Sequence, residues 1–80
     1  MTLLELAPGE TARIDAIETA DPGVQRLMVL GLVEGVEITY VRASLGGDPL
    51  EFRFYGTAIS LRREQARRFS VVPVDGPGTR

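Results

Sequence analysis

The sequence predicts a mainly β domain, a small antiparallel β-barrel with one short α-helix after the first strand. Two observations lead to this prediction. Five short apolar segments, several with apolar and polar residues in alternation, are separated by turns that contain Gly or Pro. The chain has 80 residues, of which 44% are hydrophobic, so it can form one domain with a thin core. Small antiparallel sheets of this kind avoid exposed edges by curling into a barrel.

The first strand and the helix are predicted from alternation and from capping residues. From Thr11 to Ile17, Ala and Ile alternate with Arg and Asp, and Ile17 breaks the pattern where the strand is expected to end. Asp21 can cap a helix that begins at Pro22. Gly31 ends this helix because glycine adopts the left-handed conformation without steric cost, and Leu32 is placed to fold back on the last turn.

The second strand follows a tight turn at Gly35 and is expected over residues 36–41, with its apolar side chains on one face. A loop comes next, and its turn residues are Gly47, Asp48 and Pro49.

The third strand has the clearest alternation in the chain. Its apolar residues alternate with outward-facing ones, namely Leu50, Phe52 and Phe54 with Glu51, Arg53 and Tyr55. The later elements are a turn at 56–57, a strand at 58–61, a charged helical turn at 62–68 and a last strand at 71–74. Residues 1–74 therefore form a single domain, and we expect residues 75–80 to form a flexible tail, because they carry no apolar anchor.

The composition excludes several classes of function. The formal net charge is −2, so the chain lacks the basic character typical of nucleic-acid binding. It contains no Cys and no His, which removes the usual ligands for zinc, copper and iron and the usual groups that activate a serine nucleophile. We therefore expect a protein that is not an enzyme and has no tightly bound cofactor. The missing disulfides and the absence of a long apolar run indicate a cytoplasmic protein.

Four segments in order resemble one known family. The stretch from Leu27 to Ile38 resembles the FeoA signature, a helix that ends in Leu-Gly-Leu or Leu-Gly-Met before a Gly turn and a strand. The segments 47–50 and 59–66 are similar to the family's Gly-Asp-Pro step and to its strand with an Arg-rich turn, and 6–10 resembles its opening. The chain is thus identified as a member of the FeoA family of ferrous-iron-transport accessory proteins over residues 3–74. It departs from the family pattern at 44–46, where the family often has Ala-Pro-Leu.

The resemblance implies a fold and a partner. The fold is an SH3-like barrel, and the partner is FeoB, the membrane GTP-binding ferrous iron permease, which would bring the chain to the inner membrane as a peripheral protein. One alternative is a detached metalloregulator-like SH3 domain that contacts a DNA-binding repressor. Another is a homo-oligomeric scaffold, and weak self-association is compatible with each reading. An SH3-like fold does not by itself bring peptide binding with it.

A contact surface is expected around the helix end and the loop of the long hairpin. Leu30, Leu32 and Leu45 place apolar side chains where caps and turns need few of them. Arg26 and Arg42 would supply a charged rim. The competing interpretation is that Leu30 and Leu32 only pack onto the barrel.

One basic cluster remains, with arginines at 62, 63, 67 and 68. A solvated charged turn beside Glu64 explains it better than a partner patch, because exposed charge usually contributes little.

Overall fold

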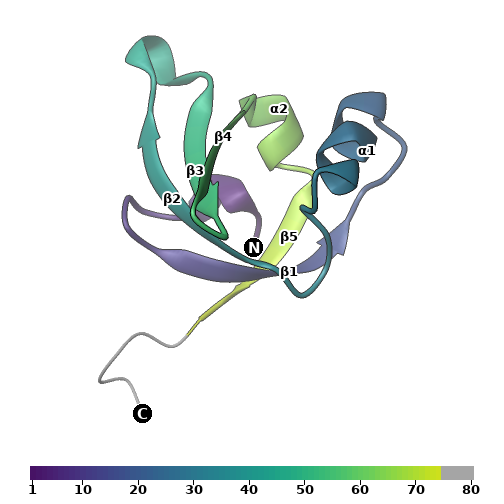
Figure 1. The fold of residues 1–80 in the computed structure, drawn as a ribbon. Helices are drawn as coiled ribbons and strands as arrows, with labels where there is room; N and C mark the ends of the chain where they lie inside the picture. Colours follow the sequence, from purple (N-terminus) through teal and green to yellow (C-terminus); the bar gives the residue numbers. More distant parts are fainter. Residues whose placement is uncertain (75–80) are drawn as a thin grey trace.

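The computed structural model describes residues 1–74, and its strands form one curved antiparallel sheet (Figure 1). The strands are β1 (Thr11–Ile17), β2 (Glu37–Ala43), β3 (Leu50–Phe54), β4 (Thr57–Leu61) and β5 (Phe69–Pro73). Their order across the sheet is β4-β3-β2-β1-β5, so β4 and β5 are the two edges. The helices are α1 (Pro22–Val29) and α2 (Arg63–Ala66), with short 3-10 turns η1 (Leu3–Glu5) and η2 (Leu45–Gly47).

The predicted fold class is confirmed: the protein is mainly β, with one short helix after the first strand and an SH3-like arrangement. The barrel is not fully closed by hydrogen bonds, since β4 and β5 do not pair. Helix α2 connects these two edges, and α1 covers one end of the sheet (Figure 1). Among residues 1–74, no helix has the length and apolar character needed to cross a membrane.

Within residues 1–74 the core is entirely apolar, and in β3 it is built as the alternation predicted. Leu50, Phe52 and Phe54 are buried, while on the other face Arg53 is exposed and Glu51 is half-buried. Sixteen buried hydrophobic residues form a single cluster that includes residues from both helices. The prediction of which β3 side chains face the core is therefore confirmed.

Four details of the strands differ from the prediction. β2 runs two residues further than the predicted 36–41, to Ala43, and β5 begins at Phe69, two residues before the predicted 71–74. A β-bulge lies between Ile14 and Ala16 in the pairing of β1 with β5. The bulge inserts a residue and shifts the alternation, so Ala16 is exposed and Ile17 packs partly against the core. β1 ends at Ile17 as predicted, and the break in the alternation comes from the bulge just before this residue.

The turn between β3 and β4 also lies one residue earlier than predicted. Its central residues are Tyr55 and Gly56, both with positive φ, and Thr57 already belongs to β4. Positive φ at both central residues defines the type I′ hairpin, whose twist matches that of the flanking strands. The tail predicted for residues 75–80 lies outside the described residues.

Candidate functional site

The end of α1 determines which leucines reach the surface. Gly31 has φ 112°, and its N–H donates to the carbonyl of Met28 at 2.9 Å. The N–H of Leu32 donates to the carbonyl of Leu27 at 3.1 Å. This pair of bonds is the Schellman motif, which returns the chain toward the helix and brings the residue after the glycine against the last turn. Leu32 is 0% exposed as a result, whereas Leu30 is 66% exposed.

The predicted contact surface is therefore corrected at one position. Leu32 cannot meet a partner in this structure, because its side chain lies in the core. The interpretation that it packs onto the barrel is the right one for Leu32 and the wrong one for Leu30. Gly31 has the left-handed conformation expected of it, and Gly35 and Gly47 also lie in turns with positive φ.

Exposed apolar side chains gather where α1 ends. Val29 is 86% exposed and lies next to Leu30. A Cβ at Gly31 would lie 3.7 Å from the ring of Phe54, so the helix end contacts the end of β3. The ring of Phe54 is followed by that of Tyr55, with 5.9 Å between ring centroids. We call the exposed residues Val29, Leu30 and Tyr55 the helix-end patch.

Tyr55 is held in this position at some conformational cost. Its φ is 51°. For a residue with a Cβ, this left-handed conformation costs about 1–2 kcal/mol. The side chain is nevertheless 80% exposed, so burial in the core does not compensate for that cost. A bulky aromatic residue in such a conformation on the surface is a candidate contact residue.

A shallow groove of about 550 Å³ adjoins Tyr55 on the outer face of the sheet. Thr11, Thr39 and Arg53 lie in register across β1, β2 and β3, and the two threonine hydroxyls are 2.7 Å apart. Gly35 and Gly56 line the groove without adding side chains, which leaves it open beside the tyrosine. The groove extends the helix-end patch with polar groups.

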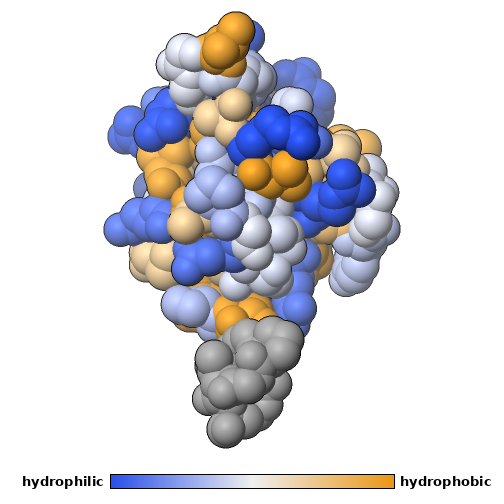
Figure 2. Space-filling view, turned by 90° about the vertical axis from the view of Figure 1, so that its left-hand side faces the viewer, coloured by the Kyte–Doolittle hydropathy of each residue, from blue (hydrophilic) through white to orange (hydrophobic). Residues whose placement is uncertain are grey.

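The tip of the β2–β3 hairpin lies apart from the helix-end patch. Figure 1 shows the tip and α1 at opposite sides of the molecule, with α2 between them. Leu45 is fully exposed at the tip, and Arg42 forms an ion pair with Glu51. Figure 2 views the hairpin side and shows apolar surface at the top, above mostly charged and polar residues. The sequence had placed Leu30, Arg26, Arg42 and Leu45 on one surface, and the structure divides them between two.

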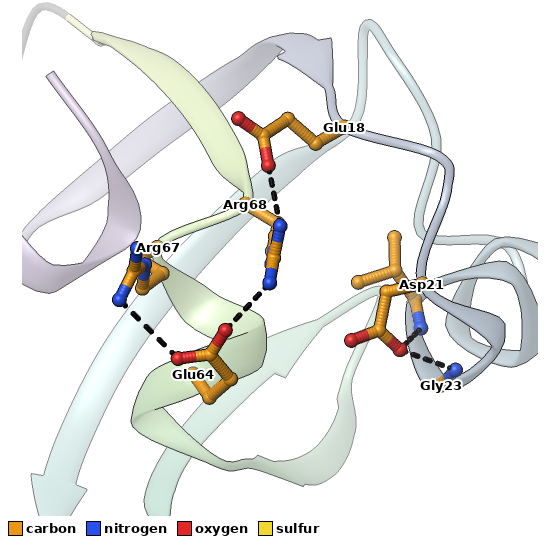
Figure 3. Close-up of polar contacts among 7 residues, drawn as sticks. Glu18, Asp21, Gly23, Glu64, Arg67 and Arg68 are labelled. Atoms are coloured by element: carbon orange, nitrogen blue, oxygen red, sulfur yellow. Dashed lines mark hydrogen bonds and ion pairs between the residues drawn. The ribbon is translucent and has the colours of Figure 1, made fainter.

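The basic cluster is occupied by contacts within the domain, as Figure 3 shows for its central part. Arg68 contacts Glu18 at 2.7 Å and Glu64 at 2.6 Å, and these two side-chain hydrogen bonds raise its pKa above the ordinary arginine value. Arg67 also contacts Glu64, at 3.3 Å.

The other two arginines of the cluster hold the hairpin loop. Arg62 lies 3.9 Å from the carboxylate of Asp48, and the guanidinium of Arg63 donates to the carbonyl of Gly47 at 3.3 Å. The backbone N–H of Arg63 donates to Asp48 at 2.9 Å. The predicted turn residues Gly47 and Asp48 thus connect the loop to α2 through contacts with these two arginines.

The described part of the chain contains no group of three or more acidic side chains that could hold a metal ion. With no His or Cys in the sequence, the residues do not form the kind of site that zinc or iron prefers.

The sequence missed two members of the helix-end patch. Val29 lies next to Leu30 in the apolar run 27–30, where hydrophobicity alone does not distinguish buried from exposed positions. Tyr55 was expected on the solvent side of β3, but its nearness to α1 depends on the contact between Gly31 and Phe54. That contact joins residues far apart in the sequence, so no local pattern indicates it.

These features define a class of protein: a small SH3-like domain whose distinguishing surface is an apolar patch at the end of its helix. The family model described as the FeoA domain matches residues 1–73. The chain belongs to the FeoA family.

Similar proteins support this assignment in sequence and in structure. The chain is 33% identical over 79 residues to the Fe(2+) transport protein A/Fe(2+) transporter FeoB fusion protein of Porphyromonas gingivalis, covering 99% of this chain and 9% of that protein. The FeoA protein of Chlorobium tepidum superposes with a TM-score of 0.85 at 36% identity, over 96% of this chain and 73% of the other. Zinc-complexed FeoA of Stenotrophomonas maltophilia is described as a prokaryotic SH3 domain protein. It superposes with a TM-score of 0.78 at 33% identity, over 90% of this chain and 89% of the other.

Proposed function

We propose that the protein assists ferrous iron uptake by binding the cytosolic face of a FeoB-type GTP-binding permease, and that it does so through the helix-end patch. In the Porphyromonas gingivalis relative, the transport protein A part and the FeoB transporter belong to one chain. A covalent link keeps two modules at high effective concentration, which is useful where the two must act together. We infer that a domain of this family acts on the same partner through a contact surface of its own.

The observation that carries the proposal is the exposure of Val29 and Leu30 at the end of α1, together with that of Tyr55, whose ring lies next to Phe54. The ring of Phe54 in turn lies near Gly31 at the helix end. Apolar patches on a small domain commonly mark a partner site, and tyrosine is among the residues that dominate binding energy at such sites. Arg26 lies one helical turn before Leu30 and is exposed, so it can form the polar rim of the contact.

The hairpin tip is a weaker candidate for the same contact. Leu45 is isolated there, since its neighbours in the turn are Ser44 and glycines. Arg42 already has Glu51 as its partner, so a second partner would have to displace that carboxylate. We therefore assign the permease contact to the helix end, and the hairpin tip provides a control surface.

Binding can be measured with the purified cytosolic domain of the permease. The double variant Val29→Ser/Leu30→Ser should weaken binding by about tenfold or more, because burial of two such side chains contributes about 1.4 kcal/mol or more. Leu45→Ser removes an equally apolar, exposed side chain at the other surface and should bind as the wild type does. Both variants should keep the wild-type melting temperature, since none of the three side chains is buried.

Equal binding by the double variant and the wild type would show that the helix end is not the contact. If wild-type protein also failed to bind the cytosolic domain, the proposed partner itself would be wrong.

A further inference from the structure

The two edges of the sheet differ in how they are covered. At β5, an isolated bridge joins Thr2 to Ser70, and the N–H of Val71 donates to the carbonyl of Met1 at 2.8 Å. The N-terminal segment therefore pairs with the outer edge of β5. At β4, no backbone hydrogen bond to a loop or cap, and no side-chain hydrogen bond, reaches residues 57–61 from elsewhere in the described chain.

The hairpin geometry identifies which groups of β4 face outward. Phe54 and Thr57 flank the two-residue turn and form a hydrogen-bonded pair, as residues in that position do. Hydrogen-bonded and non-bonded pairs alternate along an antiparallel ladder, so Ile59 and Leu61 also direct their backbone groups toward β3. The N–H and C=O groups of Ala58 and Ser60 consequently point away from the sheet, toward solvent.

This edge lacks the features that usually prevent pairing between molecules. Edge strands are commonly protected by charged side chains, by proline, by a bulge or by a covering segment. The residues of β4 are Thr57, Ala58, Ile59, Ser60 and Leu61, with no charge and no proline. The pairing of β3 with β4 contains no register shift, whereas both of the pairs β1–β5 and β2–β3 contain one. The edge is thus regular and uncharged.

We propose that β4 pairs with β4 of a second copy of this chain, antiparallel, with Ile59 on the two-fold axis. In this register Ala58 of one copy lies opposite Ser60 of the other, and each such pair exchanges both of its N–H···O=C bonds. All the outward backbone groups of Ala58 and Ser60 are then satisfied on both copies. A register shifted along the strand would leave some of these groups unpaired.

The side chains fit the same register. Ile59 packs partly against the core and meets Ile59 of the second copy, as an apolar non-hydrogen-bonded pair whose Cβ atoms come close together. Ala58 meets Ser60, so the outer face contains only small side chains. Arg62 falls opposite Gly56 of the second copy, so the arginines that follow β4 do not face each other.

A second copy is favoured over an extended segment of another protein for two reasons. The strand can pair with itself in a register that satisfies every outward backbone group, and it carries no charge that would select a different sequence. A five-residue strand buries far less than the roughly 1,200 Å² of a stable interface. The dimer is therefore weak and concentration-dependent. This inference is independent of the permease, and a failure of either proposal leaves the other standing.

A cysteine crosslink tests the register directly, because the natural chain contains no Cys. The variant Ile59→Cys places two thiols across the axis at about 4.5–5.5 Å between Cβ atoms, close enough for a disulfide after a small adjustment. Thr57→Cys is the matched control: it is on the same strand and face and is more exposed, but its thiols would lie roughly 13 Å apart. Under mild oxidation, Ile59→Cys should crosslink about tenfold faster than Thr57→Cys.

Equal rates, or faster crosslinking of the more exposed Thr57→Cys, would overturn the proposal. Sedimentation provides a second measurement. The wild type should shift from monomer toward dimer as its concentration rises to about millimolar, consistent with so small an interface. Ala58→Pro removes an outward N–H and leaves the β3–β4 ladder intact, so this variant should remain monomeric and folded.

If Ala58→Pro does not fold, Ser60→Lys places a charge on the edge and should weaken the dimer in the same way. Wild-type protein that is monomeric at every concentration would refute self-pairing. If the edge variants then lost binding to the permease, the edge would belong to a strand of that partner.

Discussion

Phe52 lies at the centre of the packing that holds the sheet together, so its removal is the most direct test of the fold. The side chain is 0% exposed, and its ring lies 5.3 Å from that of Tyr40 on the neighbouring strand. On the other side, Phe52 pairs with Ile59 of β4. Phe52→Ala should destabilise the domain by about 3–5 kcal/mol, because it removes buried apolar surface and leaves a cavity.

This loss is large relative to the whole domain. At about 0.05–0.15 kcal/mol per residue, a chain of 80 residues has a free energy of unfolding of about 4–12 kcal/mol. The melting temperature should fall by roughly 12–40 °C, or the variant should not fold at all. Urea denaturation followed by circular dichroism measures the effect. Phe52→Leu keeps much of the volume and should cost about 1–2 kcal/mol.

Leu45→Ala is the surface control, and it should stay within about 0.5 kcal/mol of the wild type because Leu45 is fully exposed. If Phe52→Ala melted near the wild-type temperature, the reasoning that places this face of β3 in the core would be refuted.

Three further predictions concern the helix and metal binding. Gly31→Ala should lower the free energy of unfolding by about 1–3 kcal/mol, because alanine is strained at the positive φ of this position. A steric clash does not contribute, since a Cβ there would meet nothing closer than 3.7 Å. A variant as stable as the wild type in urea would contradict the Schellman cap. Asp21→Ala removes the acceptor for the N–H groups of Gly23 and Val24 and should cost about 1 kcal/mol, which chemical denaturation would detect. Calorimetric titration with Fe²⁺ and with Zn²⁺ should show no stoichiometric site tighter than about micromolar; zinc bound to a relative makes this a direct comparison, and a tight site here would disprove the claim.

The sequence predicted the parts of the fold that depend on local patterns. Alternation along 50–54 indicated which side chains of β3 face the core, since period two is a property of a single strand. Asp21, Pro22 and Gly31 marked the ends of α1, because capping uses backbone groups within a few residues.

The errors lie where distant segments meet. The bulge at Ile14 depends on how β1 pairs with β5, more than 50 residues away in the sequence, so alternation within β1 alone misassigned Ala16. The turn was predicted one residue too late, at Gly56-Thr57. Tyr55 rarely adopts a left-handed conformation, so turn propensity did not favour it as a central residue.

The candidate site was predicted only in part, for the same reason. A leucine on each side of Gly31 gave no local indication of which one would be buried, and the Schellman turn decides between them. The split between the helix end and the hairpin tip depends on α2, which lies between them (Figure 1). Arg42 and Arg26 could be identified as exposed charges, but the pairing of Arg42 with Glu51 requires the β2–β3 register.

Ferrous iron uptake by living cells tests the central claim most directly. Cells that contain the permease but lack this chain would receive the wild type, Leu45→Ser or Val29→Ser/Leu30→Ser, each at equal abundance, and initial uptake of radiolabelled Fe²⁺ would be measured. Wild type and Leu45→Ser should change the uptake rate equally, because the hairpin tip is not the contact surface. The helix-end double variant should give the same rate as cells that lack the chain. A folded double variant that changes uptake as the wild type does would contradict the account.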